Sequence, residues 1–392
     1  MTVLAVPAAP AQQPPWPDPE HAATVRGLLA DRPPLVTWSE CADLLTALAA
    51  AHRGERLVVQ AGDCAERFAD AEDGPVTARL DHLDALADQV RAATGAPCVA
   101  VGRIAGQYAK PRSAPTETRA DGVVLPAYRG DLVNAPEPTP EVRRPDPGRM
   151  VTAYDCAAFV LAHLRARTAG RPPQERLHTA HEALVADYEQ PLVRTHRTGR
   201  YASSGHLVWI GDRTRDCDGW HVHWAAGVDN PIAVKIGPST TTSDAVRLSR
   251  LLNPDGVPGR LTFVARLGAR YAGRMLPDLV AEVARRGAPV LWLCDPMHGN
   301  TVRMRGGAKT RPVEAIHDEV TGFVRALRHR RLPPGGLHLE VAPDEVTECL
   351  AVPADAPAVP DRVAQPRYTS ACDPRLSPTQ ARDLVAHFTR LL

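Results

Sequence analysis

Short runs of aliphatic residues recur along the chain from residue 56 onward, and longer segments with helical periodicity separate them. Each run is four or five residues long and shows little alternation of apolar and polar positions, which is typical of strands buried on both faces of a parallel sheet. The eight runs are 56–60, 98–101, 176–179, 206–210, 232–236, 261–264, 290–293 and 337–341.

Helices are predicted between these runs, because apolar residues recur there every three or four positions. The predicted helices span 76–94, 150–167, 243–252, 275–286 and 313–329. Two more, at 21–30 and 39–53, are predicted ahead of the first run. The first residues of the chain are rich in Ala, Pro and Gln and predict a flexible arm.

Eight strand–helix units that close on themselves form a (β/α)8 TIM barrel, so the predicted fold class is α/β. The expected organisation is a flexible arm over residues 1–16, a short N-terminal helical extension over 17–55 and the barrel over 56–392. An open doubly wound sheet is the main alternative. We favour the barrel because no Gly-x-Gly-x-x-Gly loop follows the first strand.

Polar or charged side chains stand near the end of every predicted strand. In a (β/α)8 barrel the carboxyl ends of all strands open onto one mouth, where active sites form, so we expect these side chains to converge. In chain order they are Asp63, Cys64, Glu66 and Arg67, then Arg103, Gln107, Lys110, Arg112 and Ser113, then His181 and Glu182, then Asp212, Arg213 and Arg215, then Lys235, Arg266, Asp295, His298, His338 and Glu340.

Several of these residues carry fixed positive charges, and the five that we consider for anion recognition are Arg103, Lys110, Arg213, Lys235 and Arg266. Taken singly, each is more often a surface ion-pair partner than a ligand-binding group. Five cations directed to one mouth would repel one another unless anions were bound among them, and both side-chain types suit phosphate and carboxylate. We therefore predict small phosphorylated substrates that carry more than one anionic group.

A mixed set of sulfur, nitrogen and oxygen ligands is also available, from Cys64, His298, Glu340 and the later Asp373. A thiolate, an imidazole and two carboxylates suit a divalent ion such as Mn²⁺, Co²⁺, Fe²⁺ or Zn²⁺. From the pattern alone the alternative stays open: a buried structural cysteine and a histidine that is hydrogen-bonded within a loop.

Lysine is the unusual entry in the composition. The 46 basic residues include only Lys110, Lys235 and Lys309, and this bias toward arginine, together with 38 prolines, resembles the drift of a GC-rich genome. Such drift replaces lysine wherever arginine serves equally well. The three remaining lysines therefore mark positions where a compact ammonium is needed in place of a planar guanidinium.

Composition also excludes several classes of protein. The 46 basic and 45 acidic residues balance, which argues against a nucleic-acid-binding protein. No apolar run is long enough to predict a membrane span, and the segment 1–17 lacks the features of a signal peptide. The eight cysteines are scattered without CxxC pairs, as in thiols of a cytoplasmic protein, and we predict that location.

Three other patterns have simple explanations. His221 and His223 would share a face on a strand, but they stand where a helix should begin, so the two side chains should point apart. The basic run 328–331 is isolated and predicts a solvated helix end. Gly306 and Gly307 are too sparse for a phosphate-binding loop and are expected only to let the chain turn.

The chain resembles the class II, or plant-like, 3-deoxy-D-arabino-heptulosonate 7-phosphate (DAHP) synthases. The resemblance runs in order through most of the chain from residue 56. It rests on VVQAGDCAERF (58–68), VGRIAGQYAKPRS (101–113), LPAYRGDLVN (125–134), HEALVADYE (181–189), VWIGDRTRDCDG (208–219), NPIAVKIGPS (230–239), NPDGVPGRLTFVARLGA (253–269), CDPMHGNT (294–301), GGAKTRP (306–312), GGLHLEVAPDEVTEC (335–349) and RYTSACDPRL (367–376).

The resemblance implies a barrel that condenses phosphoenolpyruvate with erythrose 4-phosphate at a divalent metal, Mn²⁺ before Co²⁺, Fe²⁺, Zn²⁺ or Mg²⁺. The implied metal ligands are Cys64, His298, Glu340 and Asp373. Those implied for phosphoenolpyruvate are Arg103, Glu182, Trp209, Asp212, Arg213, Lys235 and Arg266, and those for erythrose 4-phosphate are Lys110, Pro111, Arg112 and Ser113. Lys110, Cys64 and His298 are the implied catalytic residues, with Lys110 placed to protonate the nascent alkoxide.

Some expectations concern regulation and redox state. Family members with longer chains carry extra helices between the second and third units, whereas only 114–176 separates them here, which predicts weak feedback inhibition by aromatic amino acids and a role in specialised metabolism. Trp220 and His223 also depart from the family pattern. Loss of the metal is expected to let Cys64 and Cys372 form a disulfide.

The nearest alternative is an aminoDAHP synthase, which acts on an imino-sugar phosphate and would use the same metal and phosphoenolpyruvate residues. The alternative from a different class is a non-catalytic partner of another pathway enzyme. Such a partner would be expected to lack a metal ligand or an arginine that binds phosphoenolpyruvate, and all of these residues are present. We expect a homodimer or a higher homo-oligomer.

Overall fold

Eight parallel strands close into a barrel, and their order around the barrel is their order in the chain. The structure is a computed structural model and describes residues 8–119, 121–304, 308–351 and 366–392. The α/β class and the (β/α)8 barrel predicted from the sequence are confirmed, since every predicted run overlaps one strand. The strands are β1 (Leu57–Gly62), β2 (Cys98–Arg103), β5 (His178–Glu182), β8 (Leu207–Ile210), β9 (Ile232–Ile236), β10 (Leu261–Ala265), β11 (Val290–Cys294) and β14 (Gly336–Glu340).

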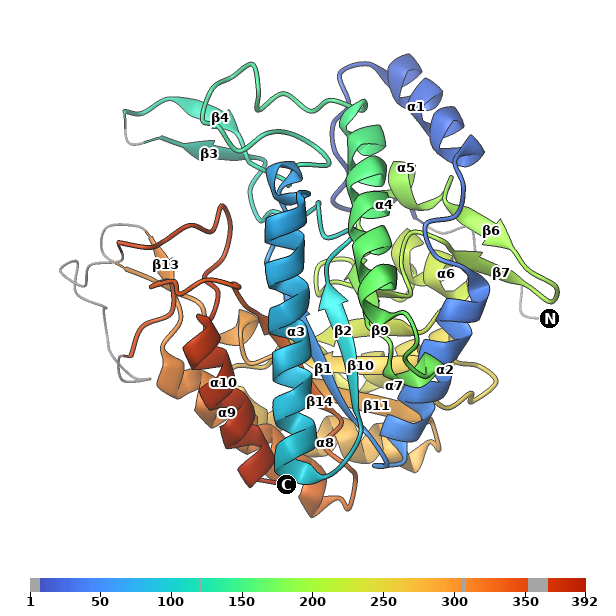
Figure 1. Ribbon diagram of the computed structural model, residues 1–392, viewed down its shortest axis with the longest axis vertical. Coiled ribbons are helices and arrows are strands. Elements are labelled where there is room, and N and C mark those ends of the chain that lie inside the picture. The colour runs from blue at the N-terminus through green and yellow to red at the C-terminus, as the bar shows by residue number, and fades with distance from the viewer. Residues whose placement is uncertain (1–7, 120, 305–307, 352–365) are drawn as a thin grey trace.

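Helices surround the barrel and connect its strands (Figure 1). They are α3 (Asp73–Thr94), α4 (Arg149–Thr168), α6 (Trp220–Ala226), α7 (Thr242–Leu252), α8 (Ala269–Arg285), α9 (Val313–His329) and α10 (Pro378–Arg390). After β5 a four-residue helix, α5 (Ala186–Glu189), and the hairpin β6 (Val193–Thr195) with β7 (Arg200–Ala202) take the place of a long helix. Three single turns complete the description: η1 (Phe68–Asp70), η2 (Pro173–Glu175) and η3 (His298–Asn300).

Two helices precede the barrel, α1 (Pro19–Asp31) and α2 (Trp38–His52). A capping box between Thr37 and Glu40 starts α2. Its apolar face, which includes Leu44 and Leu48, forms one cluster with side chains of the barrel interior such as Val58. Because α2 contacts β1, β2 and β11, it closes the end of the barrel opposite the mouth.

The alternation of side chains along each strand determines what lies inside the barrel. Apolar side chains fill its lower part. They are Val58, Val99, Val101, Ala180, Leu207, Trp209, Ala233, Val264, Leu291 and Leu293. Two residues further along the strands, the same parity presents Arg103, Glu182, Lys235 and Glu340, all buried, at the carboxyl end. The strand pattern therefore produces an apolar floor beneath a polar layer.

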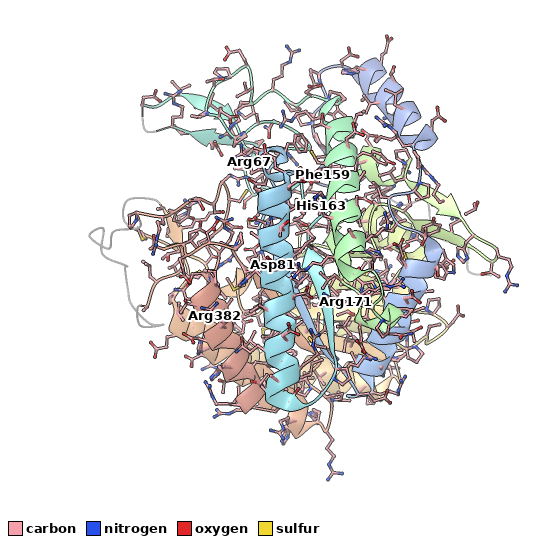
Figure 2. All side chains as sticks on the ribbon, viewed as in Figure 1. Arg67, Asp81, Phe159, His163, Arg171 and Arg382 are labelled. Atoms are coloured by element: carbon pink, nitrogen blue, oxygen red, sulfur yellow. The ribbon has the colours of Figure 1, made fainter. Side chains whose placement is uncertain are left out.

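Helices α3 and α4 pack side by side and carry ion pairs between them (Figure 2). His163 of α4 lies 2.9 Å from Asp73 at the start of α3. Arg171, just past α4, donates two 2.9 Å hydrogen bonds to Asp84 of α3. Asp84 is buried, so these contacts fix the outer helices that flank the β1 and β2 units.

The sequence prediction and the structure differ at several elements. The strand predicted at 176–179 begins and ends later, as β5, so His181 and Glu182 lie on the strand and not after it. Helix α8 begins at Ala269, six residues before the prediction, because the weak helix former Gly273 interrupts the apolar pattern there. The hairpins β3 (Thr116–Thr118)–β4 (Val124–Pro126), β6–β7 and β12 (Val302–Arg303)–β13 (Lys309–Thr310), and helix α10, were not predicted.

The predicted arm lies partly within the described residues. From residue 8 onward it runs along the barrel, and Gln13 and Trp16 are hydrogen-bonded to the segment after β5. The division of the chain into arm, extension and barrel stays a prediction. Gly306 and Gly307 lie outside the described residues. Among the described residues, no helix combines the length and the apolar character that a membrane crossing requires.

Candidate active site at the mouth of the barrel

Arg103 is the most tightly held cation of the polar layer. It ends β2, is 1% exposed, and donates from Nε to the carbonyl oxygen of Asp63 at 3.0 Å. One Nη lies 3.0 Å from a carboxylate oxygen of Glu340, and the other lies 2.5 Å from Nε2 of His338. These contacts from β1 and β14 fix the guanidinium where β1, β2 and β14 meet.

Lys235 approaches the same region from β9. Its Nζ lies 3.1 Å from Asp295 and 3.3 Å from Nδ1 of His298. The Trp209 ring lies beneath both cations, with its centroid 4.9 Å from Cζ of Arg103 and 5.8 Å from Nζ of Lys235. Burial lowers the pKa of Lys235, although the charge of Asp295 opposes this shift. Arg103 and Lys235, which are both predicted to bind phosphoenolpyruvate, therefore lie against the same Trp209 ring.

The two polar candidates of β5 point in opposite directions. Glu182 faces the barrel interior, where burial raises the pKa of its carboxyl group against the opposing charge of Lys235. Among the described residues, Oε1 of Glu182 has no hydrogen-bond partner. His181 faces outward and lies 2.8 Å from Glu189 of α5. The expectation that His181 joins the mouth is therefore wrong, because neighbouring residues of a strand face opposite sides.

A second group of cations lies at the rim. Asp212, which follows β8, accepts a 2.7 Å hydrogen bond from Arg266 and a 2.9 Å hydrogen bond from Arg215. Arg213 is exposed and donates to Oγ of Ser113 at 3.0 Å. The contact between Arg213 and Ser113 joins residues predicted for the two different substrates.

The four predicted metal ligands come together at the mouth. Ligand atoms of Cys64, Glu340 and Asp373 all lie within 4.8 Å of one another, and all three residues are buried. His298 adds its Nε2, which lies 3.0 Å from Glu340. Asp295 holds the opposite ring nitrogen at 2.7 Å and so orients the imidazole. The donor types and their convergence fit a divalent cation of borderline softness.

The charges around these ligands keep the carboxylates ionised. Burial alone would raise the pKa of Glu340, but His298 and Arg311 outweigh it and hold that pKa well below its usual value. Asp373 behaves in the same way, chiefly because of Lys110. The ammonium of Lys110 contacts both Cys64 and Asp373, so a cation already lies among the ligand atoms.

Lys110 begins the segment predicted to bind erythrose 4-phosphate. Burial disfavours its ammonium, but the charges of Asp373 and Cys64 outweigh burial and raise the pKa of Lys110 well above its usual value. Its backbone N–H donates to the carbonyl oxygen of Arg129 at 2.8 Å. Pro111 and Arg112 follow, half-buried, and Arg112 pairs with Glu117 at 3.3 Å. The whole 110–113 segment therefore lies between the metal ligands and the rim.

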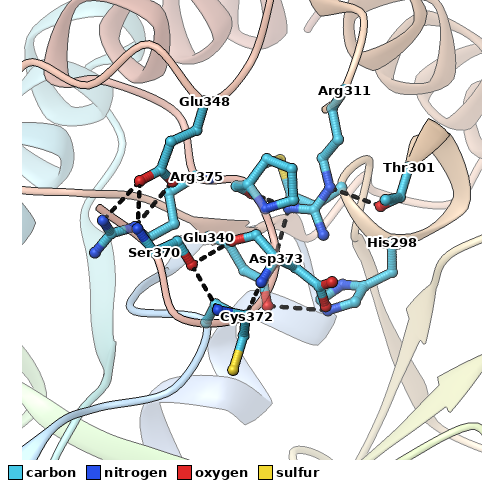
Figure 3. A network of polar contacts seen from close by, with 12 residues as sticks. His298, Thr301, Arg311, Glu340, Glu348, Ser370, Cys372, Asp373 and Arg375 are labelled. Carbon is cyan, nitrogen blue, oxygen red and sulfur yellow. Dashed lines mark hydrogen bonds and ion pairs between the residues drawn. The ribbon is translucent and has the colours of Figure 1, made fainter. Parts of the chain in front are cut away.

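The sequence prediction assigned no specific function to two residues near the predicted ligands, Arg311 and Lys309, of which Arg311 is labelled in Figure 3. Arg311 is completely buried, pairs with Glu340 at 2.7 Å and donates to Thr301 at 2.9 Å. Lys309 lies 2.6 Å from the carboxylate oxygen of Asp373 that Lys110 does not contact. Both belong to the motif GGAKTRP. In the sequence, only membership of that motif could have pointed to Arg311, because the motif does not directly follow one of the predicted barrel strands.

Three other predictions from the sequence concern the HxH pair, the basic run 328–331 and the two cysteines Cys64 and Cys372. His221, on α6, is buried and lies 3.0 Å from the carbonyl oxygen of Leu184, while His223 is half-buried, so the HxH pair is not a ligand pair. The basic run 328–331 is exposed at and after the end of α9. Cys64 and Cys372 are both free thiols. Their oxidation stays a prediction.

The class-II DAHP synthetase family model matches residues 6–175 and 171–389. The chain belongs to this family. A phospho-2-dehydro-3-deoxyheptonate aldolase of Streptomyces coelicolor is 40% identical over 423 aligned positions, which cover 95% of this chain and 93% of that protein. A probable phospho-2-dehydro-3-deoxyheptonate aldolase of Pseudomonas fluorescens is 42% identical over 376 positions, covering 94% and 92%.

A relative from Mycolicibacterium smegmatis with the same enzyme name is 37% identical, covering 98% of this chain and 92% of that protein. Among solved structures, a phospho-2-dehydro-3-deoxyheptonate aldolase from Francisella tularensis matches with a TM-score of 0.57 and 12% identity, covering 99% of this chain and 98% of that one. At that identity the likeness to the solved structure supports the barrel fold alone. Family membership rests on the match to the family model and on the sequence relatives.

Proposed function

We propose that the protein is a DAHP synthase, which condenses phosphoenolpyruvate with erythrose 4-phosphate and consumes one water to give DAHP and phosphate. The observation that carries the proposal is the meeting of two groups at one mouth. One is the set Cys64, His298, Glu340 and Asp373. The other is a layer of cations that includes Arg103 and Lys235. Family membership and the names of the relatives agree with this reaction.

The cations suit the two anionic groups of phosphoenolpyruvate. Arg103 and Lys235 lie over the Trp209 ring, and Arg266 with Arg213 lies at the rim, so carboxylate and phosphate would each meet more than one positive charge. Within the described part of the chain, Oε1 of Glu182 is buried without a hydrogen-bond partner, so it can accept a hydrogen bond from substrate or water.

The aldehyde substrate would bind along residues 110–113. Arg112 and Ser113 supply donors for its phosphate, and Lys110 is placed beside the metal ligands. We propose that the Lys110 ammonium protonates the oxygen that becomes an alkoxide when C3 of phosphoenolpyruvate attacks the carbonyl carbon. The Lys110 ammonium contacts Cys64 and Asp373, so it lies beside the site where the aldehyde oxygen would meet the metal.

Cys64, His298, Glu340 and Asp373 would hold the divalent metal, with Mn²⁺ as the proposed ion. When bound, it supplies Lewis-acid polarisation of the aldehyde carbonyl. Asp295 fixes the orientation of His298, and Arg311 does the same for Glu340, so both ligands stay in place without help from substrate.

The test is consumption of phosphoenolpyruvate by protein treated with EDTA, with and without Mn²⁺ and with and without erythrose 4-phosphate. We expect consumption only when both are present, with one phosphate released for each DAHP formed. Consumption that needs an imino-sugar phosphate in place of erythrose 4-phosphate would identify an aminoDAHP synthase. No consumption with either sugar phosphate would refute the proposed reaction.

We further propose that aromatic amino acids inhibit this enzyme weakly. Between β2 and β5 the described residues contain one long helix, α4, beside the small hairpin β3–β4. The Streptomyces alignment extends over 423 positions, more than the 392 residues of this chain, so that relative carries segments that this chain lacks. Addition of Phe, Tyr or Trp tests the proposal, and strong inhibition would refute it. A role in specialised metabolism stays a prediction.

A further inference from the structure

The N-terminal arm reaches the segment that would bind erythrose 4-phosphate. Oε1 of Gln12 accepts a hydrogen bond from the backbone N–H of Arg112 at 2.9 Å. The carbonyl oxygen of Gln12 accepts one from the guanidinium of Arg129. Arg129 in turn accepts the backbone N–H of Lys110 through its own carbonyl oxygen. One arm residue therefore supports the 110–112 backbone both directly and through Arg129.

The next residue of the arm holds the opposite side of the mouth. Nε2 of Gln13 donates to the carbonyl oxygen of Leu184 at 2.8 Å, and Oε1 accepts from the backbone N–H of Ala186 at 2.8 Å. Trp16 donates to Asp187 at 2.7 Å and anchors the base of the arm. Because Leu184 follows Glu182 by two residues, the Gln12–Gln13 pair connects the segments after β2 and β5.

Gln12 has a backbone conformation that glutamine rarely adopts. Its φ is 61°, in the left-handed region, which persists in residues other than glycine only where the surroundings support it. The cations it contacts are also crowded, since burial and the charge of Arg112 both lower the pKa of Arg129. A phosphate beside Arg112 and Arg129 would relieve that repulsion.

We infer that Gln12 is a positioning residue for the aldehyde substrate: it holds the 110–112 backbone so that Arg112 and Ser113 meet the phosphate of erythrose 4-phosphate. This inference rests on the proposed function. It also gives a reason for the arm to lie along the mouth of the barrel, since Gln12 and Gln13 are hydrogen-bonded to the segments that follow β2 and β5.

Two substitutions separate the contacts of Gln12. Gln12→Gly keeps the left-handed backbone and the carbonyl acceptor for Arg129 but removes the acceptor for Arg112. Gln12→Pro forces a negative φ, which disrupts both contacts. We expect Gln12→Gly to raise the KM for erythrose 4-phosphate about fivefold, as the loss of one hydrogen bond implies, and Gln12→Pro to raise it further. Pro15→Ala, which changes an exposed position of the same arm, is the control.

The measurements are KM for each substrate, kcat and Tm. The inference predicts that the KM for erythrose 4-phosphate rises in both Gln12 variants, while the KM for phosphoenolpyruvate and the Tm of Gln12→Gly match those of the unaltered protein and of Pro15→Ala. Unchanged KM values, or equal changes for both substrates, would overturn it. If the unaltered protein consumes no phosphoenolpyruvate with erythrose 4-phosphate, the proposed function fails instead.

Discussion

Glu319 lies on helix α9, where its carboxyl group is buried, and it provides a quantitative test of the structure. It is 1% exposed, and its oxygens accept 2.7 Å hydrogen bonds from the backbone N–H of Gly268 and from the side-chain amide of Asn300. Gly268 has a φ of 82°, and a Cβ there would lie 2.8 Å from the carbonyl oxygen of Gly299, so glycine is required. Glu319 thus ties together the loops that follow β10 and β11.

Burial raises the pKa of Glu319 from 4.5 to about 8, despite the opposing hydrogen bond from Gly268. The folded protein therefore holds this proton more tightly than the unfolded chain, and the stabilisation is complete below about pH 4.5 and is lost as the pH rises through 8. Each pH unit between these values costs about 1.4 kcal/mol. Between pH 6 and pH 8 the loss amounts to about 2–3 kcal/mol.

A glutamine at this position would remain neutral at every pH, so Glu319→Gln removes this dependence. Urea unfolding followed by tryptophan fluorescence, at intervals from pH 6 to pH 9, gives the free energy of unfolding of both proteins. We expect the variant to gain about 2–3 kcal/mol relative to the unaltered protein between pH 6 and pH 8, and nothing more above pH 9. A constant offset between the two proteins does not affect this result.

Asp278→Asn is the matched control, because it removes a carboxylate on the neighbouring helix α8 that is not buried. If the difference between Glu319→Gln and the unaltered protein stays the same at every pH, or if Asp278→Asn shows the same slope, the argument from burial is refuted.

Other predictions concern the mouth of the barrel. Lys110→Met should lower kcat by a factor of about 10²–10⁴ and leave the circular dichroism spectrum unchanged; unaltered turnover would exclude the role as general acid. Arg311→Met removes one of the buried cations that pair with Glu340 and leaves Arg103 in place, so unfolding should need about 1.5–3 kcal/mol less free energy, measured by urea titration, and an unchanged free energy would contradict the pairing. Cys64→Ser should weaken Mn²⁺ binding in a calorimetric titration of protein stripped by EDTA, whereas Cys98→Ser, a buried cysteine at the start of β2, should not.

The sequence predicted the barrel well, because strands buried on both faces carry a strong local signal. It also predicted that Arg103 and Lys235 would meet, since the position of a residue at the end of a barrel strand is determined by strand parity and closure. His181 shows the limit of that reasoning. A shift of the predicted strand by two residues was enough to hide that neighbouring residues of β5 face opposite sides.

Contacts made by loops could not be predicted in the same way. Arg311, Glu319 and Gln12 act on the mouth from the segment after β13, from α9 and from the arm, and no periodic pattern relates their positions to the strands they support. Their roles follow from distances that only the folded chain defines. The scarcity of lysine drew attention to Lys110, Lys235 and Lys309 in the sequence. It could not indicate which residue Lys309 contacts, and the contact with Asp373 is evident only in the structure.

The seam between the first and last strands has a consequence for how the protein is made. The backbone N–H of Asp373 donates to the sulfur of Cys64, 309 positions earlier, and Arg375 pairs with Asp63 at 2.9 Å. These contacts join the two ends of the circle formed by β1 and β14. During synthesis, the cluster of predicted metal ligands therefore cannot be completed until the chain as far as Asp373 has left the ribosome, so metal binding would report that the circle has closed.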